Sequence, residues 1–190
     1  AGAYDIDGEA FALGSLADSA EEDANRMIGI AGDRAVNYSA FYAAYNLTAL
    51  NNASANISEV LLNSTMNGAG CYGVPDETCT PGYAECCFAN QTENASFNLW
   101  GERFAEKAAG QNANASFEFS GGSVSQSSPF EVRVSLTARV SLNDTSRVAT
   151  FQRTSSLSRL VNISGFEDPV YAINSLGTMH RNSKFSSPAF

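Results

Sequence analysis

Asparagines in the pattern Asn-x-Ser/Thr are the residues whose type and spacing most clearly predict chemistry, because this tripeptide accepts N-linked glycans in secreted proteins. The 190-residue chain contains 17 Asn and 34 Ser or Thr, a composition that by chance alone would give about three such sequons. It contains ten: Asn37, Asn46, Asn52, Asn56, Asn63, Asn90, Asn94, Asn114, Asn143 and Asn162. We therefore expect a heavily N-glycosylated chain in which every glycosylated Asn faces solvent.

The four cysteines predict two disulfides. They are Cys71, Cys79, Cys86 and Cys87, within a loop rich in Gly, Pro and acidic residues. An even number of cysteines beside sequons indicates an oxidising, extracellular setting. A bond between the adjacent Cys86 and Cys87 would strain the backbone, so Cys71 and Cys79 are each expected to pair with one of them, in either arrangement. A zinc site is the alternative, but the spacing contains no C-x-x-C pair.

Groups that could perform catalysis are sparse. The chain has no nucleophile elbow, phosphate-binding loop, zinc-protease motif or dinucleotide-binding motif. A Ser-His-Asp triad would need the single histidine, His180, with a residue such as Asp168 and a serine that nothing marks. Glu118 and Glu131 are expected to face solvent from separate strands, whereas a glycosidase needs two converging carboxylates. We therefore expect no enzymatic activity and no catalytic residue.

Acidic residues suggest calcium binding at two places, but neither completes a known loop. The groups are Asp5, Asp7 and Glu9, and Asp76, Glu77 and Glu85. The first alternates like half of a calcium loop, without the central Gly and terminal Glu in register. A solvated acidic surface is the favoured interpretation, so we expect no metal site and no cofactor other than glycans.

Composition and charge narrow the function classes. Apolar residues make up 44% of the chain and charged residues only 16%, so Asn, Ser and Thr supply most of the polarity. The net charge of −9 argues against a nucleic-acid partner. Apolar runs are only a few residues long, which predicts no membrane span in this chain. No signal peptide is recognisable, so we expect any such segment to have been removed.

The first third of the sequence has helical periodicity. Small and apolar residues recur at intervals of three and four over residues 9–36: Leu13, Ala17, Ala20, Ala24, Met27, Ile28, Ala31 and Ala35. Gly29 and Gly32 are expected to weaken this helix near its end. A second helix is predicted over 38–48, where Tyr38, Tyr42 and Tyr45 share one face suited to a core or a subunit interface.

A third helix is predicted over residues 49–66. At about 100° per residue, Asn52, Asn56 and Asn63 fall on one face. Leu50, Ile57 and Leu61 fall on the opposite face. One helix would thus carry glycans on one side and core residues on the other.

The second half of the sequence changes to β periodicity. A short helix is expected over 97–108, with Trp100 and Phe104 on one side. Phe117 and Phe119 flank Glu118, and residues 130–142 alternate strictly between apolar and polar, as in a half-buried antiparallel strand. A turn at 143–145, return strands over 147–154 and 157–163, and an extended segment at 170–173 follow.

These elements predict an α+β fold in one compact domain. We expect a helical region at 1–68, a disulfide-stapled cysteine-rich loop at 69–96 and a mainly antiparallel β region at 97–190. The charge divides in the same way, with −12 over residues 1–118 and +3 over 119–190. Arginines that decorate a solvent-facing sheet would explain this division, and so would a dipolar subunit that stacks head to tail.

The segment Ile163-Ser164-Gly165-Phe166-Glu167-Asp168-Pro169-Val170-Tyr171 resembles a motif of archaeal secreted surface glycoproteins associated with type IV pili and archaella. In those proteins the motif follows a β-hairpin, as predicted here. The resemblance implies an archaeal cell-surface protein with an N-terminal helical segment and a β-rich outer part. The chain departs from pilins because it does not begin with a long hydrophobic helix. Either that helix has been removed or assembly uses another surface.

Two functions fit these features. The first is a structural, N-glycosylated subunit of an extracellular filament or surface layer, whose partners are copies of itself and other cell-surface proteins. The alternative is the glycosylated ectodomain of an adhesin or ligand-binding surface protein. A filament subunit needs two separate glycan-free contact surfaces, whereas a binding protein needs one concave surface.

Overall fold

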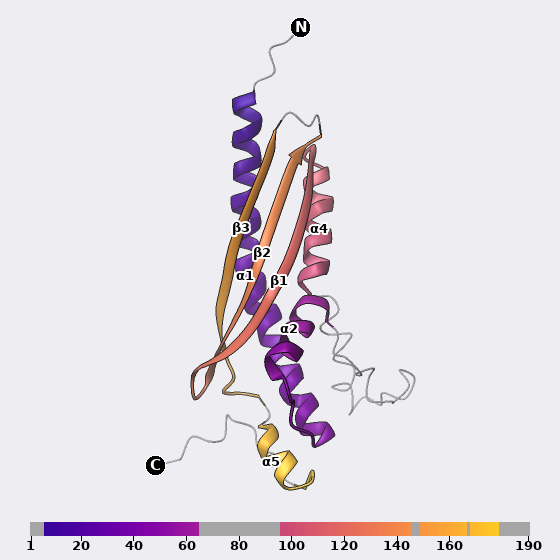
Figure 1. The fold of residues 1–190 in the computed structure, drawn as a ribbon, viewed down its shortest axis with the longest axis vertical. Helices are drawn as coiled ribbons and strands as arrows, with labels where there is room; N and C mark the ends of the chain where they lie inside the picture. Colours follow the sequence, from indigo (N-terminus) through magenta and orange to yellow (C-terminus); the bar gives the residue numbers. More distant parts are fainter. Residues whose placement is uncertain (1–5, 65–95, 146–148, 167, 179–190) are drawn as a thin grey trace, which may run out of the picture.

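The computed structural model describes residues 6–64, 96–145, 149–166 and 168–178. The elements in order are α1 (Ile6–Asn46), α2 (Ala53–Asn63), α4 (Phe97–Ala109), β1 (Ala113–Ser128), β2 (Glu131–Asp144), β3 (Thr150–Asn162) and α5 (Pro169–Asn174). The strands form an antiparallel sheet in the order β1-β2-β3, and α1, α2 and α4 cover one of its faces (Figure 1). The fold is therefore α+β. The four cysteines, and the disulfides predicted for them, lie outside the described residues.

Helix α1 is one continuous helix of about 60 Å, at about 1.5 Å per residue. The prediction of two helices over this region is wrong, since α1 runs without a break from Ile6 to Asn46 and Gly32 is used for packing against the sheet. A β-carbon on Gly32 would lie 3.3 Å from Val161 Cγ2 and 3.5 Å from Val134 Cβ, so glycine lets the helix approach the sheet closely. The predicted stripe of small residues is otherwise confirmed as buried: Leu13, Ala17, Ala20, Ala24, Ile28, Ala31 and Ala35.

Helix α2 is shorter than predicted. It begins at Ala53 because Asn52 is its N-cap, whose side chain accepts a hydrogen bond from the Ala55 N–H at 3.2 Å. Ile57 and Leu61 are buried as expected. Leu50 lies before the helix, partly buried against the same core.

The sheet contains longer strands than the sequence pattern predicted. Strand β2 alternates as expected, with buried Val134, Leu136, Ala138, Val140 and Leu142. Strand β1 extends over the whole of Ala113–Ser128, far beyond the two phenylalanines that were recognised. Strand β3 is continuous, so the prediction of two return strands is wrong. The alternation passes through the expected break, because Leu157 and Val161 continue the buried face.

The segment predicted as extended at 170–173 belongs to helix α5. Asp168 stands before the helix, and its Oδ1 accepts a hydrogen bond from the Val170 N–H at 3.0 Å. Pro169 then occupies the first helical position, where its missing N–H costs nothing. A turn follows the sheet before α5, since the Phe166 N–H donates to the Ile163 carbonyl at 3.1 Å.

The core is built from two clusters of buried residues that lie along the inner face of the sheet. One contains Ile28, Leu61, Phe97 and Leu136, and the other contains Leu13, Phe104 and Leu142. Trp100 contacts both clusters. Its ring makes edge-to-face contacts with Phe117 and Phe119 at centroid distances of 5.2 and 5.8 Å. The inward-facing rings of β1 thus join α4 to the sheet.

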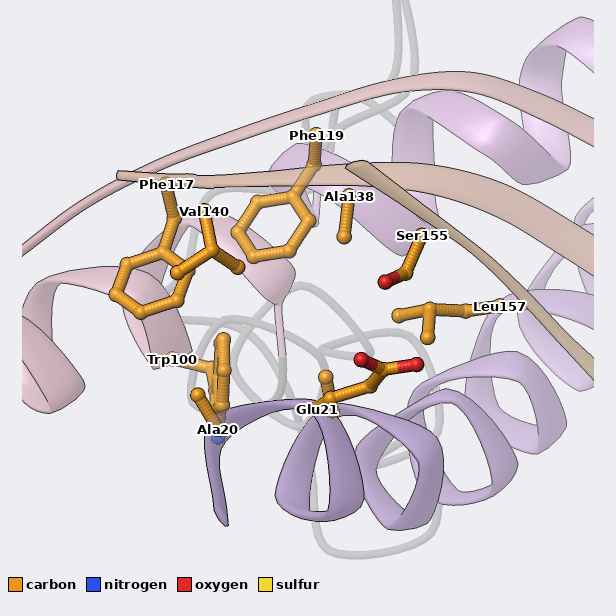
Figure 2. Close-up of a pocket in the computed structure, with 10 residues that line it drawn as sticks. Ala20, Glu21, Trp100, Phe117, Phe119, Ala138, Val140, Ser155 and Leu157 are labelled. Atoms are coloured by element: carbon orange, nitrogen blue, oxygen red, sulfur yellow. The ribbon is translucent and has the colours of Figure 1, made fainter. Parts of the chain in front are cut away.

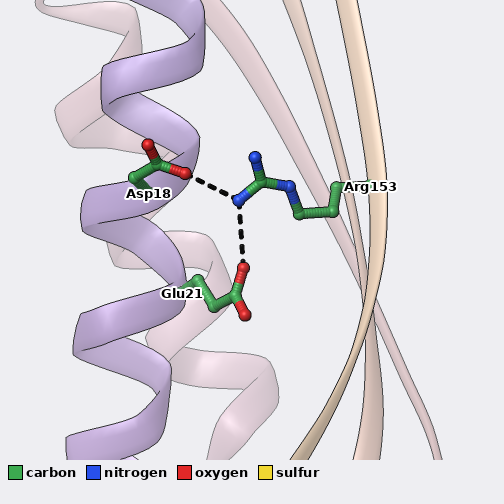
Figure 3. Close-up of polar contacts among 3 residues, drawn as sticks. All are labelled: Asp18, Glu21 and Arg153. Atoms are coloured by element: carbon green, nitrogen blue, oxygen red, sulfur yellow. Dashed lines mark hydrogen bonds and ion pairs between the residues drawn. The ribbon is translucent and has the colours of Figure 1, made fainter.

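An ion-pair cluster joins α1 to the edge strand β3. Arg153 Nη1 lies 2.6 Å from Asp18 Oδ1 and 3.2 Å from Glu21 Oε2 (Figure 3). The hydrogen bond that Arg153 donates to Asp18, and then the one that it donates to Glu21, raises the pKa of the Arg153 guanidinium above its usual value. Part of the charge division seen in the sequence is therefore neutralised within the molecule, where an acidic helix meets a basic strand.

Replacing Arg153 with Met should lower the thermal midpoint of unfolding by a few degrees at most. The ion pairs are largely exposed, so their contribution is modest and screened by salt. Methionine retains much of the aliphatic stem, whereas the cation over the Phe151 ring is lost. Differential scanning fluorimetry at low and high salt measures the effect. A difference from wild type that does not shrink in high salt would contradict an electrostatic origin.

Candidate interaction surface on the outer face of the sheet

The sheet has a second face, here called the outer face, on the side opposite the helices. Along β2 the even-numbered side chains point towards the helices and the odd-numbered side chains point away from them. Residues paired with β2 on β1 and β3 point to the same side as their partners, so the register assigns the residues of all three strands to one face or the other. Most of its side chains are hydroxyls: Ser116, Ser120, Ser123, Ser125, Ser135, Thr137, Ser141, Thr150, Thr154, Ser156 and Ser158. The outer face is thus a polar surface that needs no covering layer.

Charges on the outer face are few and partly compensated. Arg139 Nη1 lies 3.7 Å from Glu118 Oε2 on the neighbouring strand. Arg133 Nη1 donates to Ser158 Oγ at 3.4 Å, and Ser135 Oγ donates to the same oxygen at 3.1 Å. Arg133 and Arg139 therefore lie on the solvent-facing side of the sheet, whereas Arg153 and Arg159 point towards α1.

Three sequon asparagines lie on this outer face. Asn114 and Asn143 are direct Cα partners on β1 and β2, at the end of the sheet beside the first half of α1. Asn162 is paired with Glu131 at the opposite end. Asn114 and Asn162 are exposed, and Asn143 is half-buried. Glycans at Asn114 and Asn143 would grow from adjacent points, because facing side chains on paired strands have β-carbons about 5 Å apart.

The helical sequons are arranged less regularly than predicted. Asn52 caps α2 and does not belong to a helix face, and Asn56 is half-buried. Asn63 is exposed and accepts a hydrogen bond from the side-chain amide of Asn98 in α4. Asn37 is half-buried within α1. The side chain of Asn46, and the whole of Asn90 and Asn94, lie outside the described residues.

The structure does not bring the candidate catalytic carboxylates together. From Glu131 to Arg139, the Cα partner of Glu118, strand β2 runs about 26 Å at about 3.3 Å per residue. A glycosidase pair is separated by about 5 to 9.5 Å. Asp168 is used as a helix cap.

The other candidate catalytic and calcium-binding residues lie outside the described residues. They are His180, Asp5, Asp76, Glu77 and Glu85, together with the side chains of Asp7 and Glu9. Within the described part of the chain, no three His, Cys, Asp or Glu side chains are grouped as a metal site would require.

A small cavity lies between α1, α4 and the inner face of the sheet (Figure 2). Its volume is about 10 Å³, the space of about one water molecule. Trp100, Phe117, Val140 and Leu157 supply apolar walls, and Glu21 lies at its edge. The cavity is a packing gap where two helices lie under one sheet, and it is too small for an organic ligand.

Contacts between α2 and β1 were not recognised in the sequence. Ser54 Oγ accepts a hydrogen bond from the Val124 N–H at 3.1 Å. Ser58 Oγ lies so close to Gly122 that a β-carbon there would be 1.8 Å away. The register of β1 against β2 shifts between Ser120 and Ser123. The paired glycines at 121 and 122 were the available signal, because glycine inside a strand marks a bulge or a close approach.

Comparison with known proteins gives no match. No family model, curated protein or solved structure matches this chain. Helices long and apolar enough to cross a membrane are absent from the part of the chain that the structure describes. A functional proposal therefore depends on the surfaces of the molecule itself.

Proposed function

We propose that the chain is a structural, heavily N-glycosylated extracellular protein, a subunit of a cell-surface filament or surface layer that contacts copies of itself and other surface proteins. The supporting observation is the separation of two kinds of surface. The outer face of the sheet is polar and bears Asn114, Asn143 and Asn162. Residues 6–36 of α1 contain no sequon, and they expose Phe11 to 80% and Ile30 to 54%.

This separation suits self-association through α1. Glycans are bulky and hydrophilic, so a surface that carries them resists close packing between subunits. Exposed apolar side chains on the part of α1 that has no sequons, residues 6–36, favour contact with another protein. The cavity beneath the sheet gives no support to the alternative of a ligand-binding ectodomain, because one water molecule would fill it.

Electron microscopy of the native protein tests the assembly. We expect long polymers, and discrete particles of one subunit would overturn the proposal. Phe11→Asp should abolish polymers, because a buried, unpaired carboxylate at a contact is costly. Leu160→Asp is the matched control: Leu160 is 44% exposed on the outer face, and its replacement should leave polymers unchanged.

The glycan component is tested separately by mass. Denatured protein from its natural source should exceed the polypeptide mass of 20.1 kDa and should decrease towards it after deglycosylation. A denatured mass of 20.1 kDa before treatment would overturn the glycoprotein proposal.

A further inference from the structure

The described sequons differ in where the fold places the hydroxyl two residues after the asparagine. Glycan transfer requires both the Asn side chain and this hydroxyl. In a strand, residues two apart point to the same side. In a helix they point about 200° apart, at about 100° per residue. A helical sequon that turns its Asn towards solvent must therefore turn its hydroxyl towards the core.

The helical sequons follow this geometry. Ser39, the hydroxyl partner of Asn37, is 1% exposed and donates to the Ala35 carbonyl at 2.8 Å. Ser58, the partner of Asn56, is held against Gly122 of β1.

The hydroxyl of the Asn52 sequon is also held by the fold. Asn52 Oδ1 accepts from the Ala55 N–H, and Ser54 Oγ accepts from the Val124 N–H in β1. Its hydroxyl is thereby part of the docking between α2 and the sheet. Ser39 is buried, and Ser54 and Ser58 are half-buried against the sheet, so a transferase would have full access to these three hydroxyls only after the helices had detached.

The sequons of the sheet present both groups together. Asn114 and Ser116 are both exposed on the outer face. Asn143 is followed by the exposed Thr145 at the end of β2. Asn162 forms a tight turn in which its Oδ1 accepts the Ser164 N–H at 2.9 Å, which holds the asparagine and the serine within one turn.

We propose that the folded chain can be N-glycosylated at its three sheet sites, Asn114, Asn143 and Asn162. At the three helical sites, Asn37, Asn52 and Asn56, glycans can be attached only before the chain folds. The donor is a lipid-linked oligosaccharide. A bond forms between Asn Nδ2 and sugar C1, the bond from C1 to the lipid phosphate oxygen breaks, the phosphate leaves with the electron pair, and Nδ2 releases a proton. The inference extends the glycoprotein part of the proposed function.

The test compares the folded chain with peptides that span each sequon. The full chain, produced without glycans, is treated with a purified single-subunit oligosaccharyltransferase and a lipid-linked oligosaccharide, and site occupancy is followed by mass spectrometry. Each site's rate is divided by the rate of its own peptide. Because α1 and α2 are docked in the core, this ratio should fall at least about 100-fold at Asn37, Asn52 and Asn56. It should stay near one at the three sheet sites.

Because Asn114 and Asn143 are neighbours, a glycan on one could hinder transfer to the other. The variant Asn114→Gln therefore allows Asn143 to be measured alone, and Asn143→Gln allows Asn114 to be measured alone. Modification of Asn37 or Asn56 in the folded chain at the peptide rate would overturn the inference. Failure of all three sheet sites, while their peptides react, would overturn it too. Neither result depends on polymer formation or on the glycans of the natural protein. Failure of this inference can therefore be distinguished from failure of the proposed function.

Discussion

Replacing Phe97 with Ala should destabilise the domain by about 3 to 5 kcal/mol, the usual cost of deleting a fully buried aromatic ring. Phe97 is 0% exposed at the first position of α4, and its ring lies 5.0 Å from that of Phe119, edge to face. It also belongs to the cluster that contains Leu61 and Leu136. The loss therefore affects contacts among α2, α4 and the sheet together.

Urea denaturation followed by circular dichroism and by fluorescence of Trp100, whose ring lies 6.4 Å from Phe97, measures this loss. Because domains of this size have a free energy of unfolding of about 5 to 15 kcal/mol, the variant should lose at least about one fifth of it, and all of it at the lower end of that range. Phe11→Ala is the matched control, since Phe11 is 80% exposed, and it should change the value by less than about 0.5 kcal/mol in the monomer. Equal effects of the two substitutions would contradict the position of α4 in the core.

Replacing Gly122 with Ala should cost about 1 to 3 kcal/mol through overpacking. The added β-carbon would lie 1.8 Å from Ser58 Oγ, 2.6 Å from Ser58 Cβ and 3.3 Å from Ser58 Cα. Rotation of the serine side chain relieves only the first contact, so α2 or β1 must shift. Unfolding by urea gives the free-energy change, and the hydrogen bond from Val124 to Ser54 should weaken in the same variant.

A double-mutant cycle isolates this contact. Ser58→Gly removes both close side-chain atoms at a helix cost of about 1 kcal/mol, and Gly122→Ala should then destabilise much less. Gly14→Ala is the matched control, because a β-carbon there meets nothing within 4 Å. It should stabilise α1 by about 0.5 to 1 kcal/mol. If Gly122→Ala lowered the free energy of unfolding equally in the wild type and in the Ser58→Gly variant, the contact with Ser58 would not be the cause of the destabilisation.

Local periodicity predicted the class of the fold because the buried faces of α1 and β2 are regular. The strict alternation through Val134, Leu136 and Ala138 and the small-residue stripe of α1 each specify one face. The same reasoning failed where a residue acts through tertiary contact. Gly32 was interpreted as weakening a helix, although it permits contact with Val134 and Val161.

Errors at β3 and α5 have a different origin. Ser155 and Ser156 resemble a break in a strand, but pairing with Ala138 and Thr137 holds them in the sheet. Apolar residues after Pro169 resemble a strand, but the cap at Asp168 starts a helix. Strand pairing and helix capping determine the conformation of these two segments. Neither of them is visible in the spacing of hydrophobic residues on which the prediction was based.

The candidate surface was predictable only in part. The sequons identified which asparagines could carry glycans, but not which hydroxyls the fold uses. That distinction depends on contacts such as Ser54 with Val124, between residues far apart in the sequence. Likewise, the charge division suggested stacking between subunits, and the structure shows that Arg153 neutralises part of it internally.

The edge strands of the described sheet affect how the chain can avoid uncontrolled strand addition. Among the residues that the structure describes, strands β1 and β3 each have a neighbouring strand on one side only, so each could act as a template for another chain. In β3, Arg153 and Arg159 occupy inward positions, where an added strand would have to accommodate charged groups beside α1. In β1, the bulge at Gly121 and Gly122 interrupts the register. These features oppose the addition of further chains to the sheet edges, strand by strand, as in amyloid. Ordered assembly would therefore depend on contacts between side chains on the surfaces of neighbouring molecules, which natural selection can change one residue at a time.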